Sequence, residues 1–205
     1  MLPGLRTTHD WTTYVDPDHV RQVREDLSQW QGDSLEHLVL EVLAYALDEA
    51  VHGSTRAVHV RRHDDGSWSV QDDGRGTDTR LDARGVPVVK PVMATPDLRF
   101  FDADSDEVLA DGFRRSGMSV VTAASAWLVH ENRRADGAWR TRYESGLPVG
   151  DPESIEPDGT SGTLVRFLPD PELVSSHAAE RVSALCREAT ADHVVDLTID
   201  DAAGS

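Results

Sequence analysis

Residues 35–53 read LEHLVLEVLAYALDEAVHG, and residues 69–76 read SVQDDGRG. Asp33 before the first stretch, with Glu36 three positions later, has the pattern of a helix N-cap, and Gly53 is a typical helix end. Apolar residues recur between them at the spacing of a helix face, at Leu35, Leu38, Val39, Val42 and Ala46. The sequence therefore predicts a helix over residues 34–52.

Four polar residues of this helix form a second stripe. His37, Glu41, Tyr45 and Asp48 follow one another at spacings of four, four and three, so their side chains share one face. Such a stripe either faces water or lines a pocket, and the periodicity alone leaves both alternatives open. A histidine one turn before a glutamate can orient it or tune its pKa, and that glutamate can take a proton from water.

The second stretch lies at the end of a predicted hairpin. Residues 56–61 and 67–71 have the composition of strands, and Asp64-Asp65-Gly66 between them is a turn signal. SVQDDGRG therefore begins in the second strand and continues where the chain leaves the sheet. Asp-Gly pairs are common in plain turns, so the stretch alone fits both a turn and a ligand site.

The remaining elements complete the expected fold. A short helix is predicted at 19–30, within an N-terminal arm of residues 1–32, and residues 201–205 are predicted to be a disordered tail. Long loops between 77 and 117 are typical of a functional cover. Further helices are predicted at 118–128 and 176–193, and further strands at 127–134, 139–144, the end of 159–169, and 194–200. Because helices and hairpin strands are segregated, we expect an α+β sandwich with helices on one face of a mainly antiparallel, mixed sheet.

Composition narrows the classes of function. The chain has 37 acidic and 20 basic residues and a formal charge of −17, which disfavours direct binding to nucleic acid. There is no run of eighteen apolar residues and no signal-peptide pattern, so we expect a cytoplasmic protein without a membrane span. The single cysteine, Cys186, excludes an internal disulfide.

Three more stretches match one family in the same order as the first two. They are GMSVVTAASAWL (117–128), RTRYESGLP (140–148) and DGTSGTLVRFLPD (158–170). Together the five resemble the N-terminal ATPase domain of the DNA gyrase B protein, in the GHKL superfamily, from about Ser34 to Pro169. The resemblance implies a two-layer GHKL (Bergerat) sandwich over residues 33–200 that binds ATP.

The resemblance also implies roles for single residues at the reactive end of the ligand and at its base. Glu41 matches the general base that activates water, and His37 matches the residue that supports it. Asp72 matches the aspartate that accepts a hydrogen bond from the adenine amino group. Thr163 matches the threonine that assists Asp72 through a bound water.

Other matches surround the base and the phosphates. Gly74 and Gly76 match glycines that let the backbone pass close to base and sugar, and Arg75 matches an arginine beside the adenine. Arg140 matches an arginine at the pocket mouth. In the segment that covers the triphosphate, the resemblance places two family glycines at Gly112 and Gly117.

The sequence departs from the family at two places. Tyr45 stands where the family has an asparagine that binds Mg²⁺, and a phenol does not reproduce that carbonyl contact, so Mg²⁺ would have to be held by phosphates and water. Asp111 would repel phosphate. Arg114 and Arg115 replace backbone that would cradle the phosphates, and their guanidinium groups are candidate phosphate contacts.

These observations leave three hypotheses. The first is an ATP-binding module with weak or partner-dependent hydrolysis and no topoisomerase activity of its own, because 205 residues leave no room for the family's further domains. The second is an active ATPase with Glu41 as base. The third is a non-catalytic interaction or decoy protein that retains the fold and pairs with a second copy or a gyrase-like partner through its arm.

Overall fold

The protein, described by a computed structural model, forms one open sheet with helices packed against it. The description covers residues 10, 12–51, 53, 55–101, 106–135, 137–175 and 179–201. The helices are α1 (Pro17–Glu25), α2 (Leu35–Val51), α3 (Met118–Ala123) and α4 (Ala179–Thr190), with 3₁₀ turns η1 (Leu27–Trp30) and η2 (Pro91–Met93). The strands are β1 (Ala57–Arg62), β2 (Trp68–Asp72), β3 (Ser125–Arg134), β4 (Gly137–Glu144), β5 (Leu147–Pro148), β6 (Glu153–Ser154), β7 (Gly162–Pro169) and β8 (Asp196–Asp201).

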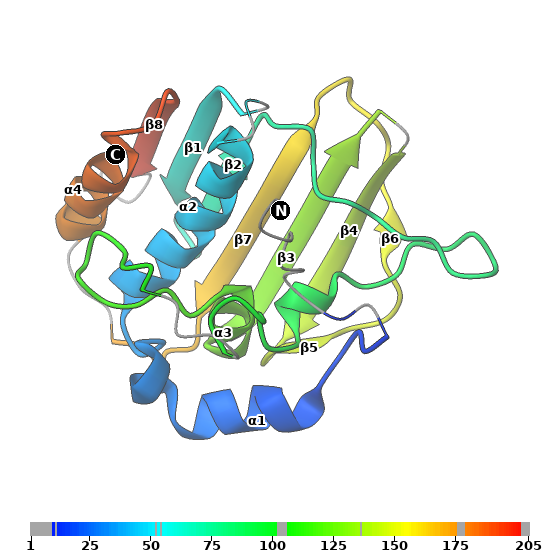
Figure 1. Cartoon of the computed structure of the whole chain (residues 1–205), viewed down its shortest axis with the longest axis horizontal. Helices are drawn as coiled ribbons and strands as arrows, with labels where there is room; N and C mark the ends of the chain where they lie inside the picture. Colours follow the sequence, from blue (N-terminus) through cyan, green and yellow to red (C-terminus); the bar gives the residue numbers. More distant parts are fainter. Residues whose placement is uncertain are drawn as a thin grey trace, which may run out of the picture.

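Seven of the eight strands lie in the order β5-β4-β3-β7-β2-β1-β8, and the eighth, β6, pairs with β4. Within the described part of the chain, β1 and β8 pair in parallel and the other named strands pair antiparallel. In Figure 1, α2, α3 and α4 lie on one side of the sheet and α1 runs along its lower end. The predicted α+β sandwich with a mixed, mainly antiparallel sheet is therefore confirmed.

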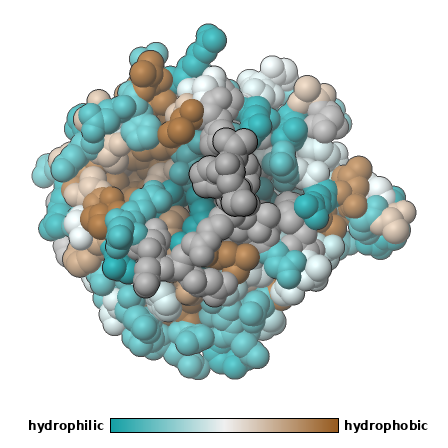
Figure 2. All heavy atoms as spheres, viewed as in Figure 1, coloured by the Kyte–Doolittle hydropathy of each residue, from teal (hydrophilic) through white to brown (hydrophobic). Residues whose placement is uncertain are grey.

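The core fills the layer between helices and sheet. In each long strand, alternate side chains point toward the helices, so that Val60, Leu128 and Phe167 are fully buried against Leu38 and Leu43 of α2. Burying each such side chain stabilises the fold by about 1.5–3 kcal/mol. Hydrophilic side chains predominate on the outer surface of the helix-bearing side (Figure 2). Among the described residues, no helix combines the length and the apolar character that crossing a bilayer requires.

The N-cap of α2 differs from the prediction by one residue. The Ser34 hydroxyl, not the Asp33 carboxylate, accepts a hydrogen bond from the His37 N–H at 3.4 Å. The backbone carbonyl of Asp33 accepts the N–H of Ser175 at 2.9 Å, which ties this turn to the end of the chain segment after β7. Pairing with a distant segment has therefore decided which residue caps the helix.

The predicted helix over 118–128 is too long. The observed helix ends at Ala123, and β3 begins at Ser125, whose hydroxyl donates to the carbonyl of Val121 at 2.7 Å. Small residues favour a helix here, but Leu128 pairs with Phe167 of β7, and this pairing overrides local preference. The other predicted strands occur with small shifts of their ends.

The segment predicted as an arm contains packed structure. Asp16 caps α1 by accepting the N–H groups of Asp18 and His19. The His19 Nε2 lies 2.9 Å from the Ser119 hydroxyl of α3, and Val20 of α1 is buried in the core. Residues 1–9 and 11 of the arm, and 202–205 of the predicted tail, lie outside the described residues, so both boundaries stay predictions.

Candidate nucleotide site

The polar stripe of α2 faces into the protein. His37 and Glu41 are 0% and 1% exposed, although each carries a charged or polar group. Their side chains lie one helical turn apart, and the His37 Nε2 is 3.3 Å from a Glu41 carboxylate oxygen. The structure thus brings the two predicted catalytic residues together. At His37 and Glu41, the polar stripe of α2 faces the buried interior of the protein and not solvent.

Both oxygens of Glu41 are already engaged. The segment of residues 106–117, called the lid segment below, folds over α2 and presents its last backbone amides to this carboxylate. The Ser116 N–H donates to one oxygen, and the Gly117 N–H donates to the other at 3.0 Å. Gly117 has a φ of +94°, a conformation that glycine adopts without strain, and this directs its N–H toward the helix.

Asp111 of the lid segment binds His37. Its carboxylate lies 2.7 Å from the His37 Nδ1, on the ring nitrogen opposite to the one near Glu41. Burial lowers the pKa of His37, but the hydrogen bond to Asp111 and the nearby Glu41 carboxylate, together with both negative charges, outweigh burial and raise it to about 9. At neutral pH His37 is therefore a cation held between two carboxylates.

Arg115 fills the space beside Glu41. It is 4% exposed, and its guanidinium contacts Asp48 of α2 at 2.8 Å and Glu107 at 2.7 Å, while its Nε lies 3.8 Å from Glu41. Burial would raise the pKa of Asp48, but the hydrogen bonds and charges of Arg115 and Arg99 hold it below its ordinary value. The guanidinium of Arg115 is thus bound to carboxylates of the chain itself.

Asp72 is the last residue of β2, where the chain leaves the sheet. Its side chain is 5% exposed and accepts a hydrogen bond from the Gly74 N–H at 2.9 Å. Burial raises the pKa of Asp72 to about 6, despite hydrogen bonds from the backbone of Gly74 and Thr163, and the charges of Glu49 and Asp73 add to the increase. Asp72 remains mostly ionised at neutral pH and accepts hydrogen bonds.

Thr163 faces Asp72 across the β2–β7 pair. Gln71 pairs with Leu164; Asp72 comes one position after Gln71, Thr163 comes one position before Leu164, and both residues are buried. Among the described residues, the buried Thr163 Oγ1 is one of few side-chain atoms without a hydrogen-bond partner. A buried carboxylate beside an unused hydroxyl can hold a polar group that donates and accepts hydrogen bonds.

At Gly76, the turn that follows β2 lies in close contact with β3. A Cβ on Gly76, whose φ is +75°, would lie 2.6 Å from the carbonyl oxygen of Arg133 and 2.6 Å from the Asn132 side chain. The Asn132 amide oxygen, in turn, accepts the Thr77 N–H at 2.8 Å and fixes the turn. Arg75 points outward, with its Nε 3.0 Å from Glu49 of α2.

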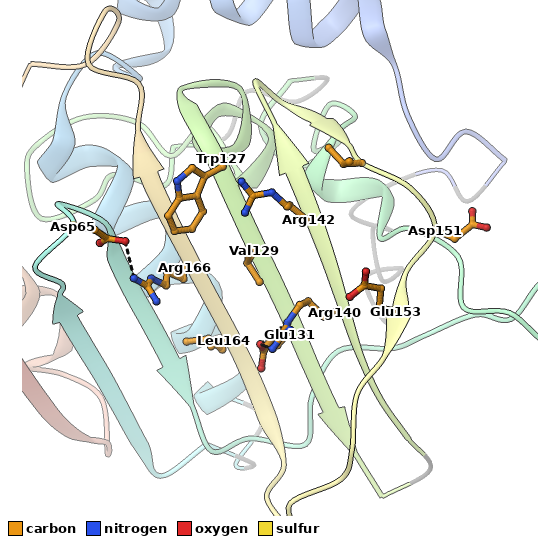
Figure 3. Close-up of a pocket in the computed structure, with 11 residues that line it drawn as sticks. Asp65, Trp127, Val129, Glu131, Arg140, Arg142, Asp151, Glu153, Leu164 and Arg166 are labelled. Atoms are coloured by element: carbon orange, nitrogen blue, oxygen red, sulfur yellow. Dashed lines mark hydrogen bonds and ion pairs between the residues drawn. The ribbon is translucent and has the colours of Figure 1, made fainter.

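Three predicted residues lie apart from these two groups. Arg140 lies on the helix-free face of the sheet, where it contacts Glu131 at 2.6 Å beside a cavity of about 540 Å³ (Figure 3). Arg114 is exposed and contacts Asp106 at 3.5 Å. Gly112 forms the tip of the lid segment with a φ of +86°, and an added Cβ there would meet no atom within 4 Å.

Sequence reasoning misses Glu107, which contacts Arg115, and the buried His130. Glu107 lies in an acidic loop, and no local pattern pairs it with Arg115. His130 on β3 stands opposite Val165 and is 5% exposed, and burial lowers its pKa to about 3, so it is neutral. The alternation of Leu128 and His130 along β3 is the signal that could have placed this histidine inside.

Tyr45 is a poor ligand for Mg²⁺. Burial, followed by the charge of Glu49, raises the pKa of Tyr45, so its hydroxyl stays a neutral phenol, whereas Mg²⁺ requires carboxylate or carbonyl oxygens in octahedral geometry. Within the described ranges, no group of three or more His, Cys, Asp and Glu side chains is arranged to hold a metal ion. By contrast, the ionised Asp72 and the unused Thr163 hydroxyl fit the amino group and ring nitrogen of adenine.

Comparison with known proteins identifies the domain. The chain is 34% identical over 148 residues to the B protein of DNA topoisomerase 4 from Streptococcus pneumoniae and 37% identical over 145 residues to the B protein of DNA gyrase from Thermotoga maritima. These matches cover 71% and 69% of the chain. The chain contains a gyrase B-like domain.

The match has a defined extent. The gyrase B-like domain is also 36% identical over 141 residues to the B protein of DNA gyrase from Mycobacterium leprae. The aligned parts amount to 23%, 22% and 21% of the three relatives, so the chain spans about a fifth of the length of the curated relatives it matches. No protein-family model matches the chain.

Proposed function

We propose that the gyrase B-like domain binds an adenine nucleotide, hydrolyses ATP weakly or only with a partner, and has no topoisomerase activity of its own. One observation carries this proposal: the buried, largely ionised Asp72 stands beside the unused Thr163 Oγ1. In this proposal Asp72 accepts a hydrogen bond from the adenine amino group and Thr163 assists it. Gly74, Gly76 and Arg75 border the base.

The state of the predicted base supports weak hydrolysis. A general base needs a free oxygen within hydrogen-bond reach of the attacking water. Both oxygens of Glu41 accept backbone N–H groups from the lid segment, and His37 is held by Asp111. Glu41 therefore becomes available only when the lid segment moves, a step that a partner protein would have to favour.

Calorimetric titration with ATP and a non-hydrolysable analogue tests the proposal, with and without Mg²⁺. A hydrogen bond to a charged acceptor contributes about 1.5–3 kcal/mol, so Asp72→Asn is expected to weaken binding at least tenfold. Asp200→Asn is the matched control, because Asp200 is an exposed aspartate on β8 that contacts His59. Equal affinities of the two variants would contradict the assignment of Asp72.

A second candidate function is a non-catalytic interaction or decoy protein. The observation that favours it is the occupied state of Glu41, Asp48 and His37, which leaves the stripe of α2 bound to the chain's own lid segment. In this case the N-terminal arm, residues 1–32, would carry contacts to a second copy or a gyrase-like partner. Light scattering of the protein with and without residues 1–9 distinguishes the two: unchanged mass and unchanged nucleotide affinity would contradict this candidate.

A further inference from the structure

The two groups of candidate site residues, a lid end and a base end, differ in how many of their polar atoms already have hydrogen-bond partners. At the lid end, which comprises His37, Glu41 and Asp48 of α2, every one of these side chains already contacts a group of the lid segment. At the base end, around Asp72, the buried Thr163 Oγ1 is without a hydrogen-bond partner among the described residues. Unpartnered buried polar atoms indicate where a ligand would be stabilised most.

Two nitrogens at the lid end also lack a hydrogen bond, but both face a carboxylate. The His37 Nε2 lies 3.3 Å from Glu41, and the Arg115 Nε lies 3.8 Å from the same carboxylate. Each belongs to a cation whose charge is already balanced by this carboxylate and by a second one, Asp111 or Asp48. These nitrogens are therefore not free to bind a ligand while the lid segment stays in place.

The lid segment is itself an ordered hairpin. Val108 and Arg114 form an antiparallel bridge, the Leu109 N–H donates to the Phe113 carbonyl at 2.8 Å, and the Arg115 N–H donates to the Glu107 carbonyl at 2.9 Å. The Glu107 carboxylate and the Arg115 guanidinium lie 2.7 Å apart beside this ladder. The closed arrangement is thus built from both backbone and side-chain contacts.

Charge opposes a phosphate tail at both ends. A triphosphate carries several negative charges and needs free cations or backbone N–H groups. Arg115 is neutralised by Asp48 and Glu107, and the Ser116 and Gly117 amides are occupied by Glu41. At the base end, the carboxylate of Asp72 is itself negative and does not attract a phosphate group.

We infer that the closed lid segment makes this a nucleoside site: it takes a neutral purine nucleoside through the base end, without Mg²⁺ and without stabilisation by phosphate groups. Arg115 and Asp111 are the specificity-determining residues, because their contacts with α2 remove the groups that would bind the phosphates. The inference rests on the proposed adenine recognition by Asp72. It differs from that proposal in naming which part of the nucleotide contributes affinity.

Calorimetry with adenosine, AMP, ADP and ATP on the intact protein tests the inference. Dissociation constants within about threefold of one another, unchanged by Mg²⁺, are expected. ATP that binds more than tenfold tighter than adenosine, or that requires Mg²⁺, would overturn the inference and leave the proposed function standing. Failure of all four ligands to bind at millimolar concentration would overturn both.

Amide hydrogen exchange of the protein without ligand gives an independent readout. The Ser116 and Gly117 amides are expected to be protected, because they donate to a buried carboxylate. Arg115→Gln should increase their exchange at least tenfold, whereas Arg84→Gln, at an exposed arginine paired with Asp82 in its own loop, should leave it unchanged. Rapid exchange of both amides in the unsubstituted protein would show that the lid segment is open and would overturn the inference.

Discussion

The charge state of His37 has a measurable consequence at the scale of one residue. The folded-state pKa of about 9 lies above the ordinary value of 6.5, so protonated His37 stabilises the fold fully below pH 6.5, and this contribution is lost as pH rises through 9. A pKa difference of this size corresponds to about 3 kcal/mol as an upper bound.

Urea unfolding at pH 6, 7.5 and 9 tests this prediction. Stability of the unsubstituted protein should decrease over this range more than that of His37→Gln, in which no group titrates between Asp111 and Glu41. Comparing the two proteins cancels the contribution of other groups, including Lys90, whose pKa burial lowers to about 8. Parallel pH profiles would contradict a charged His37.

Some site residues can be predicted from the sequence alone, and others cannot. The sequence assigns His37, Glu41 and Asp72 to a pocket, and the structure buries all three. Arg115 is predicted from the sequence as a candidate phosphate contact, and it is instead bound to Asp48 and Glu107, which are 67 and 8 positions away. Ion pairs between distant segments leave no periodic signal, so the pattern of one segment could not reveal them.

At the scale of elements, the contact between β2 and β7 depends on Gly162. A Cβ at this position would lie 2.0 Å from the backbone carbonyl oxygen of Asp72, and the φ of Gly162 is +122°. Gly162→Ala is therefore expected to force the strands apart beside Asp72 and to cost about 2–3 kcal/mol of stability.

Gly159→Ala is the matched control in the loop before β7. Gly159 also has a positive φ, +80°, but an added Cβ would meet no atom within 4 Å, so only backbone strain of about 1 kcal/mol is expected. Denaturant unfolding of both variants gives the comparison. Equal losses of stability would show that the close approach to Asp72 is unimportant for the strand pair.

Elements are predictable where the local pattern agrees with the tertiary contacts. The helix over 34–52 and the hairpin of β1 and β2 have strong periodicity and turn signals, and the structure has α2 at Leu35–Val51. The short α3 and the early start of β3 could not be predicted, because pairing of β3 with the distant β7 decides where the helix ends. Local propensity does not contain that pairing.

At the scale of the molecule, the order of five sequence stretches led to the correct fold. Each stretch alone fits several structures, but the order of all five fits one family. The closed state of the pocket was not predicted, since it depends on where the lid segment folds. Its contacts join α2 to a segment far along the chain, for example His37 to Asp111, 74 positions later.

A crystal structure of the protein with bound adenosine would show directly whether Asp72 recognises the base. We expect the purine amino group within hydrogen-bond distance of the Asp72 carboxylate, close to the Thr163 hydroxyl, with the lid segment still on Glu41. A purine bound elsewhere, for example in the cavity beside Arg140 on the helix-free face, would contradict the assignment of Asp72 as the residue that recognises the base.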